Sequence, residues 1–179
     1  MNISALKTLL VDDLRALGEA HRCSIERLED FPFTALIPRV QAARDEFLRE
    51  TRAQVGELES MFKRLGGPST GGTCGGVRGI LEELDTVAAR ESGAYPPIHG
   101  DSRFLAVLWK LLQYRMAACR VAMVTAHVLE SWGIEEMLKA AWERDRALER
   151  VVSELMVQVL RLVCAETPDE ASRAVEVLA

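Results

Sequence analysis

The stretch FLRETRAQVGELESMFKRLGGPSTGGTCGGVRGILEE, residues 47–83, decides the fold. Its first half, residues 47–65, places apolar side chains at helical spacing among charged ones, which predicts an amphipathic helix. Glycines and a proline then crowd residues 66–76, where a helix has no support, and a second, shorter helix opens at Val77. Two helices joined by a long connection, without an alternating strand pattern, indicate an all-α chain.

The rest of the chain repeats this helical pattern. Local start and stop signals, such as Asp30-Phe31-Pro32, Gly133 and Thr167-Pro168, divide it. The predicted helices cover residues 3–29, 37–65, 77–90, 102–132, 134–163 and 168–178. Four of them are long, and a longer crossover separates the second long helix from the third. This order predicts a four-helix bundle in residues 1–165, with a short C-terminal helix in residues 166–179 packed on or beside it.

Composition limits the partners and the compartment. A chain of 179 residues with 49% hydrophobic residues is long enough for one domain with a single core. The net charge of −5, without a block of Lys or Arg, argues against nucleic acid. Lys110, Arg115 and Arg120 interrupt the most apolar segment, residues 104–132, which argues against a membrane span. Four scattered cysteines without a C-x-x-C motif predict reduced thiols in a cytoplasmic protein.

Four short motifs, in this order and spacing, resemble one known family. They are Leu14-Arg15-x-Leu17, Glu50-Thr51-x-x-Gln54, Cys74-Gly75-Gly76-Val77-x-Gly79-Ile80 and Asp145-Arg146-Ala147. Together they resemble the YciE/YciF-like family of bacterial stress-associated, ferritin-like proteins. The resemblance implies a ferritin-like bundle, a role in stress and a homodimer. It also implies a dimetal site, built from carboxylates and histidines of all four long helices.

Much of that ligand set is missing from this chain. The positions where the resemblance implies ligands are occupied instead by His21, Phe47, Leu112 and Arg115. Acidic residues remain at three positions, namely Glu50, Asp145 and Glu149. Residues 104–128 contain no Asp or Glu at all, so the third long helix cannot supply its share of a dimetal site.

Arg115 leads to two competing hypotheses. Its guanidinium cannot lose its proton, and it is well shaped to bridge carboxylates. We therefore expect Arg115 to replace the metal as the central cation of an ion-pair network that includes the retained acids and Gln54. Alternatively, His21, Glu50, Asp145 and Glu149 could hold one iron, manganese or zinc ion. The substitution by arginine favours the network, and no cofactor is expected.

The sequence leaves three alternatives for the function of the protein. The missing acids favour a non-catalytic structural or interaction protein with a degenerate dimetal site, and no catalytic residue is predicted. The others are a metal-binding protein with possible oxidase chemistry and a helical module that binds a small molecule or peptide. The apolar surplus of residues 104–132 suggests a homodimer or another protein partner. Cys74 is either a reactive thiol in its glycine-rich loop or, as we favour, a small buried anchor.

Overall fold

Five helices make up most of residues 3–90 and 98–164, the part of the chain that the computed structural model describes. They are α1 (Ile3–Asp30), α2 (Pro38–Leu65), α3 (Gly75–Arg90), α4 (Ile98–Val128) and α5 (Trp132–Val163). No strand occurs in these ranges, so the predicted all-α class is confirmed. The short helix predicted within residues 166–179 lies outside the described residues.

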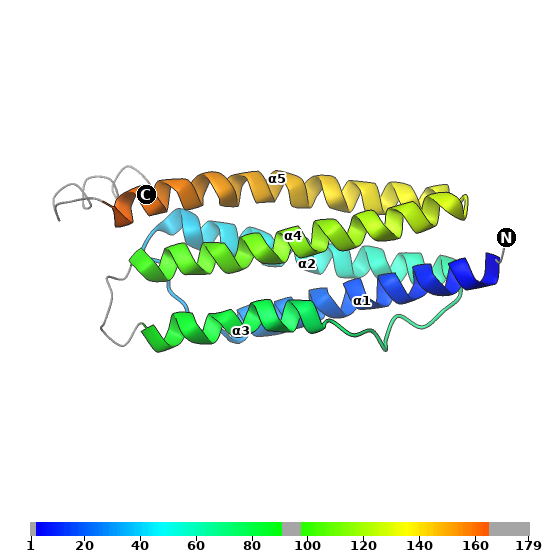
Figure 1. The fold of residues 1–179 in the computed structure, drawn as a ribbon, viewed down its shortest axis with the longest axis horizontal. Coiled ribbons are helices and arrows are strands. Elements are labelled where there is room, and N and C mark those ends of the chain that lie inside the picture. Colours follow the sequence, from blue (N-terminus) through cyan, green and yellow to red (C-terminus); the bar gives the residue numbers. More distant parts are fainter. Residues whose placement is uncertain (1–2, 91–97, 165–179) are drawn as a thin grey trace.

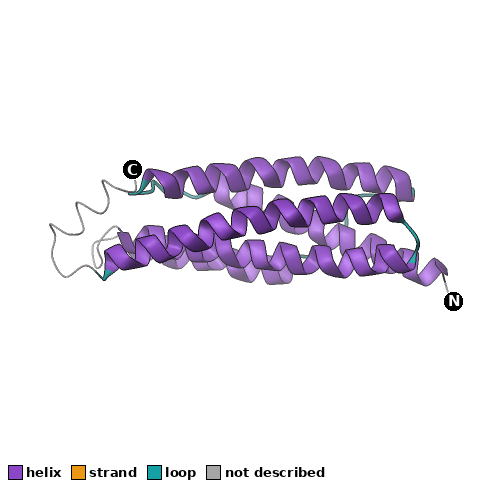
Figure 2. Ribbon diagram, turned by 90° about the horizontal axis from the view of Figure 1, so that it is seen from above, coloured by secondary structure: helices purple, strands orange, loops and turns teal. Residues whose placement is uncertain are grey.

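The four long helices, α1, α2, α4 and α5, form the predicted ferritin-like bundle (Figures 1 and 2). α1 and α2 run antiparallel, and so do α4 and α5 (Figure 1). α2 ends at the opposite end of the bundle from the start of α4, so the chain must travel back along it. The connection of residues 66–74 and the shorter helix α3 make most of this crossover, which is the feature expected of a ferritin-like bundle. None of the described helices is long and apolar enough to cross a membrane.

Both local residue types and a tertiary contact stabilise the ends of α2. Pro38 is the first residue of α2, where its missing N–H costs nothing. Ile37 cannot cap the helix with its side chain, and Asp101 of α4 does so instead. The Asp101 carboxylate accepts hydrogen bonds from the backbone N–H of Leu36 at 3.0 Å and of Ile37 at 2.8 Å. At the other end Gly66 closes α2 in the left-handed conformation, with φ of 73°.

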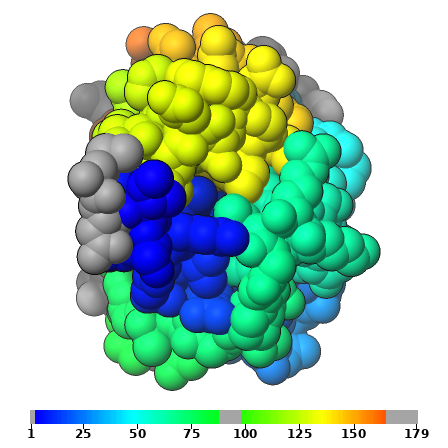
Figure 3. Space-filling model, turned by 90° about the vertical axis from the view of Figure 1, so that its right-hand side faces the viewer, coloured from blue at the N-terminus to red at the C-terminus, as the bar shows by residue number. Residues whose placement is uncertain are grey.

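The turn between α4 and α5 differs from the prediction. Gly133 was expected to close the third long helix, but α4 already ends at Val128 and Gly133 lies in the first turn of α5. Glu130 makes the turn with a positive φ of 52°, and the Ser131 carbonyl accepts the first hydrogen bonds of α5. A Cβ at Gly133 would lie 2.9 Å from the Arg64 guanidinium of α2, a flexible side-chain end that can move aside, so glycine is not strictly required here. Figure 3 looks onto this end of the bundle.

The buried apolar residues fall into two clusters, one toward each end of the bundle. One cluster contains Phe47, Phe104 and Leu108, and its aromatic rings stack, with the Phe33 and Phe104 centroids 4.2 Å apart. The other contains Leu14 and Leu138 near the turn between α4 and α5. Along each long helix the two clusters are separated by buried polar residues, which therefore form a layer across the middle of the bundle.

Candidate functional site

Five buried polar side chains form this central polar layer, and all four long helices contribute to it. They are His21 of α1, Thr51 and Gln54 of α2, Arg115 of α4 and Asp145 of α5. Each is at most 2% exposed, so its polar atoms depend on partners inside the protein, and among these five side chains only His21 Nδ1 is left without one. The helical pattern explains how they meet, because each residue continues the inward-facing stripe of its own helix between apolar neighbours.

Arg115 lies at the centre of the layer and forms an ion pair with Asp145. Its Nη2 donates to Asp145 Oδ1 at 2.5 Å and its Nε donates to Oδ2 at 3.1 Å, so the contact is bidentate. Its Nη1 donates to Thr51 Oγ1 at 2.7 Å, and the Thr51 hydroxyl donates in turn to the Phe47 carbonyl at 2.6 Å. The guanidinium carbon lies 4.9 Å from the centre of the Phe47 ring, a cation–π contact.

Gln54 and His21 extend the layer to α1 and fix each other's orientation. Gln54 Nε2 donates to Asp145 Oδ1 at 2.8 Å, which leaves its amide oxygen facing His21 Nε2 at 2.8 Å. The His21 Nε2 must therefore carry the proton and donate. Burial, and next the positive charge of Arg115, lower the pKa of His21 to about 3. His21 is thus neutral at physiological pH.

The charges of the layer balance without any added ion. Burial raises the pKa of Asp145, and the Arg115 guanidinium opposes that rise. The bidentate contact keeps Asp145 ionised at neutral pH, so one negative and one positive charge face each other. With His21 neutral, the layer carries no net charge.

Two of the acids predicted to surround Arg115 lie elsewhere. Glu50 sits at the edge of the bundle, where it pairs with Arg49 at 2.6 Å and Arg144 at 3.1 Å. Glu149 accepts hydrogen bonds from Trp109 at 2.6 Å and from the Gln113 side chain at 3.2 Å. The prediction of one network around Arg115 thus needs correction. Other side chains nearby, rather than Arg115, pair with or donate hydrogen bonds to these two carboxylates.

Sequence reasoning missed Thr51 as a member of the layer, although a signal was present. Thr51 lies four residues after Phe47 and three before Gln54, so all three share the inner face of α2. His21, a metal ligand in the alternative hypothesis, lies at the far end of a hydrogen-bonded chain that leads through Gln54 to Asp145.

The layer does not fit a pair of metal ions. Both oxygens of Asp145 are engaged by Arg115 and Gln54, and the guanidinium fills the position where cations would be needed. Among the described residues, the set of His21, Glu50, Asp145 and Glu149 does not converge to metal-ligand distance. The only convergent group of His, Cys, Asp and Glu in these ranges is Glu19, Cys23 and Cys74, which lies outside the layer.

Comparisons with known proteins place the chain by family and fold. No curated protein matches its sequence. The Escherichia coli stress protein YciF has a similar structure, with a TM-score of 0.78, 16% sequence identity, and coverage of 87% of this chain and 97% of that one. YcfI from Rhodopseudomonas palustris, described provisionally as a structural protein, gives a TM-score of 0.77, 21% identity, and coverage of 86% and 96%.

The family model described as "Domain of unknown function (DUF892)" matches residues 5–163, which is nearly all of the described bundle. The family match and the two similar structures also confirm the resemblance drawn from the sequence motifs. The chain therefore belongs to the DUF892 family of YciF-like helical bundle proteins.

Proposed function

We propose that this chain is a non-catalytic structural or interaction protein whose central layer is held by an ion pair in place of metal ions. The observation that carries the proposal is the bidentate contact between Arg115 and Asp145 in the middle of the bundle. It supports a stress-associated scaffold better than an oxidase, because oxidase chemistry at a dimetal site needs exchangeable cations and open coordination positions.

Electrostatics supports the same conclusion. Two divalent cations need several anionic oxygens to offset dehydration and mutual repulsion. The layer offers one carboxylate, Asp145, and a fixed cation, Arg115, already neutralises it. A divalent ion entering here would meet a guanidinium that cannot be deprotonated.

The contacts of the layer also suggest what it does for the scaffold. Arg115 and Asp145 join α4 to α5, Thr51 adds α2, and the hydrogen bond between Gln54 and His21 adds α1. Sliding any one helix along its axis would leave a buried polar atom without its partner. The layer thus fixes the register of the four helices, as buried polar groups do in some coiled coils.

A partner-binding role is supported by the apolar residues that remain exposed. Val121, Val124 and Val128 of α4 are 57%, 66% and 44% exposed, and Trp132 at the start of α5 is 54% exposed. Because these residues lie near one end of the bundle, they offer a continuous contact for a second copy of the chain. We propose a homodimer on this basis, while the cytoplasmic location we propose rests on the cysteine pattern of the sequence.

Metal retention tests the proposal. The purified protein would be incubated without oxygen with Fe(II), Mn(II) or Zn(II), desalted and analysed for metal content. We expect no near-stoichiometric metal in the wild-type chain. A Cys23→Ser variant measured in parallel separates any metal held by thiols from metal held in the bundle centre. Near-stoichiometric metal that persists in Cys23→Ser and is lost in Glu50→Ala or Asp145→Ala would refute the proposal and support the metal-binding alternative.

A further inference from the structure

Two cysteines from distant parts of the sequence meet beside the bundle. The Sγ atoms of Cys23, on α1, and Cys74, just before α3, lie 3.1 Å apart. Cys74 is buried, at 1% exposed, whereas Cys23 is half-buried and reaches the surface. The Cys74 carbonyl accepts a hydrogen bond from the Arg78 backbone N–H at 3.0 Å, so Cys74 is the N-cap residue directly before α3.

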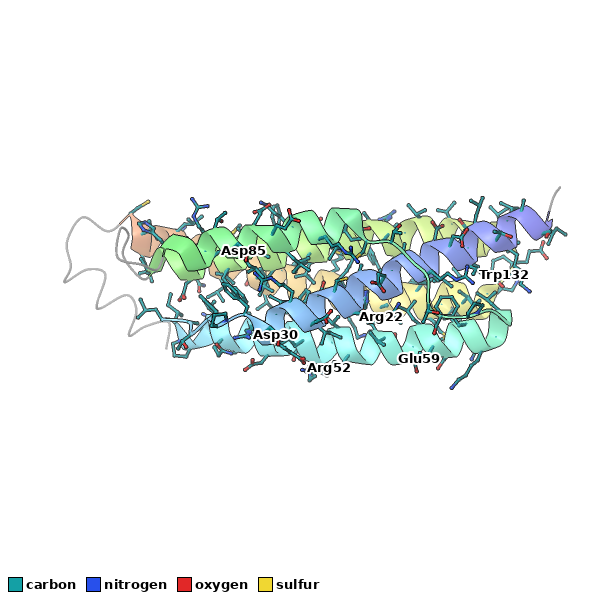
Figure 4. The ribbon with its side chains drawn as sticks, turned by 90° about the horizontal axis from the view of Figure 1, so that it is seen from below. Arg22, Asp30, Arg52, Glu59, Asp85 and Trp132 are labelled. Carbon is teal, nitrogen blue, oxygen red and sulfur yellow. The ribbon has the colours of Figure 1, made fainter. Side chains whose placement is uncertain are left out.

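The connection of residues 66–74 already lies against α1, so the two sulfurs are held in place by the fold. Arg15 Nε donates to the Pro68 carbonyl at 3.0 Å, and Arg22 reaches the Ser69 carbonyl at 3.5 Å. A Cβ on Gly72 would lie 2.2 Å from the Arg15 carbonyl oxygen, which shows how closely the two backbones approach. Figure 4 shows this connection crossing α1 on its way to α3.

The charged groups around the sulfurs favour thiol chemistry over cation binding. The Glu19 carboxylate lies between Arg78 and the sulfurs: its Oε1 is 3.8 Å from Arg78 Nη2 and accepts a hydrogen bond from Cys23 Sγ at 3.7 Å. Hydrogen bonding with the two thiols raises the pKa of Arg78. Glu19 completes a group of metal-ligand size, yet its carboxylate is shared with Arg22 at 3.1 Å and Arg78 at 3.8 Å. A cation here would face two guanidinium groups, whereas Arg78 favours a thiolate at Cys23, against burial and the Glu19 carboxylate, which disfavour it.

We propose that Cys23 and Cys74 form a reversible disulfide when the protein meets a peroxide, and that this bond fastens residues 66–74 and the start of α3 to α1. The inference is independent of the proposed function of the central layer. Cys23, the more exposed sulfur, attacks the peroxide O–O bond and becomes a sulfenic acid, while its thiol proton leaves with the released oxygen as water. Cys74 then displaces the sulfenic hydroxyl, which departs as a second water with the Cys74 proton. Two thiols and one hydrogen peroxide thus give one disulfide and two waters.

The surroundings also set the speed of this reaction. Burial raises the pKa of Cys23 to about 11, and the hydrogen bond from Arg78 opposes that rise. The thiolate is therefore scarce at neutral pH, and the oxidation rate should rise about tenfold per pH unit between pH 7 and pH 9. An Arg78→Gln variant should react several-fold more slowly, because the thiolate loses its neighbouring cation.

Intact mass, peptide mapping and thermal unfolding together test the disulfide. The full-length Cys164→Ser protein, which lacks the exposed thiol, would be treated with hydrogen peroxide and compared with its reduced form. We expect the loss of two hydrogens, a linked pair of peptides containing Cys23 and Cys74, and a Tm higher by roughly 10 °C that dithiothreitol reverses. Cys23→Ser in the same background is the matched control and should show none of these changes.

Three results would overturn the proposal. The first is accumulation of sulfinic acid at Cys23 without a cross-link. The second is a linkage that involves Cys119, whose pKa burial raises to about 12. The third is a protein with the Cys23–Cys74 cross-link whose oxidised and reduced forms have the same Tm, because the disulfide would then not stabilise the packing of residues 66–74 on α1.

Discussion

Replacing Arg115 by methionine should lower the free energy of unfolding by about 3–5 kcal/mol, because Asp145 would remain buried without its cation. Methionine has a similar length and is apolar, so packing is largely kept and the change reports the lost charge. Two hydrogen bonds to Asp145 and one to Thr51 disappear together. For a protein whose total stability is about 5–15 kcal/mol, the loss is large.

The loss should depend on pH in a direction that identifies its cause. Without Arg115, burial would raise the folded-state pKa of Asp145 further above its unfolded value. The native state then holds a proton that the unfolded state has released, so stability falls as pH rises above the ordinary carboxyl pKa. The Arg115→Met variant should therefore be weaker at pH 7.5 than at pH 5.5.

Urea unfolding followed by far-UV circular dichroism would measure both effects. Arg52→Met is the control, because Arg52 pairs with Glu29 where both side chains are exposed, and it should cost about 1 kcal/mol or less. The double variant Arg115→Met/Asp145→Leu should recover most of the loss, since no buried charge is left unpaired. A single variant within 1 kcal/mol of wild type, or a double variant no better than Arg115→Met, would refute the ion-pair account.

Three further perturbations follow from the structure. In the native state the pKa of His21 is lowered to about 3, whereas in the unfolded state it keeps its ordinary value of 6.5. Below pH 6.5 the unfolded state therefore binds a proton at His21 that the native state does not bind. Stability should therefore fall by about 2 kcal/mol between pH 6.5 and pH 5 in urea titrations, and His21→Gln should flatten that slope. Gly72→Ala should destabilise the protein measurably in thermal unfolding because the new Cβ meets the α1 backbone, whereas the control Gly56→Ala, in open space within α2, should stabilise it by about 0.5–1 kcal/mol. Asp101→Ala should cost about 1–2 kcal/mol and speed hydrogen exchange at the backbone N–H groups of Leu36 and Ile37, directly before α2, and unchanged exchange at both would contradict its capping role.

Local signals in the sequence located most helix ends correctly. The predicted helix over residues 37–65 corresponds to Pro38–Leu65, because proline at the first position and Gly66 after the last act within the backbone itself. The end of α4 was misplaced because Glu130 takes a left-handed conformation that its residue type does not favour. The role of Asp101 at the start of α2 had no local signal, because its partners Leu36 and Ile37 lie 65 and 64 residues away along the chain.

Residue types and their spacing were enough to predict an all-α bundle with a long crossover, whose third long helix carries a fixed cation where acids are missing. These features depend on residue type and helical spacing, both of which are local. Only the tertiary structure decided that Arg115 pairs with Asp145 rather than with Glu50 or Glu149, because that choice depends on how each helix is rotated about its axis. It also brought Cys23 to Cys74 across 51 residues, since contact between a thiol on α1 and one just before α3 is set by how the connection of residues 66–74 packs on α1.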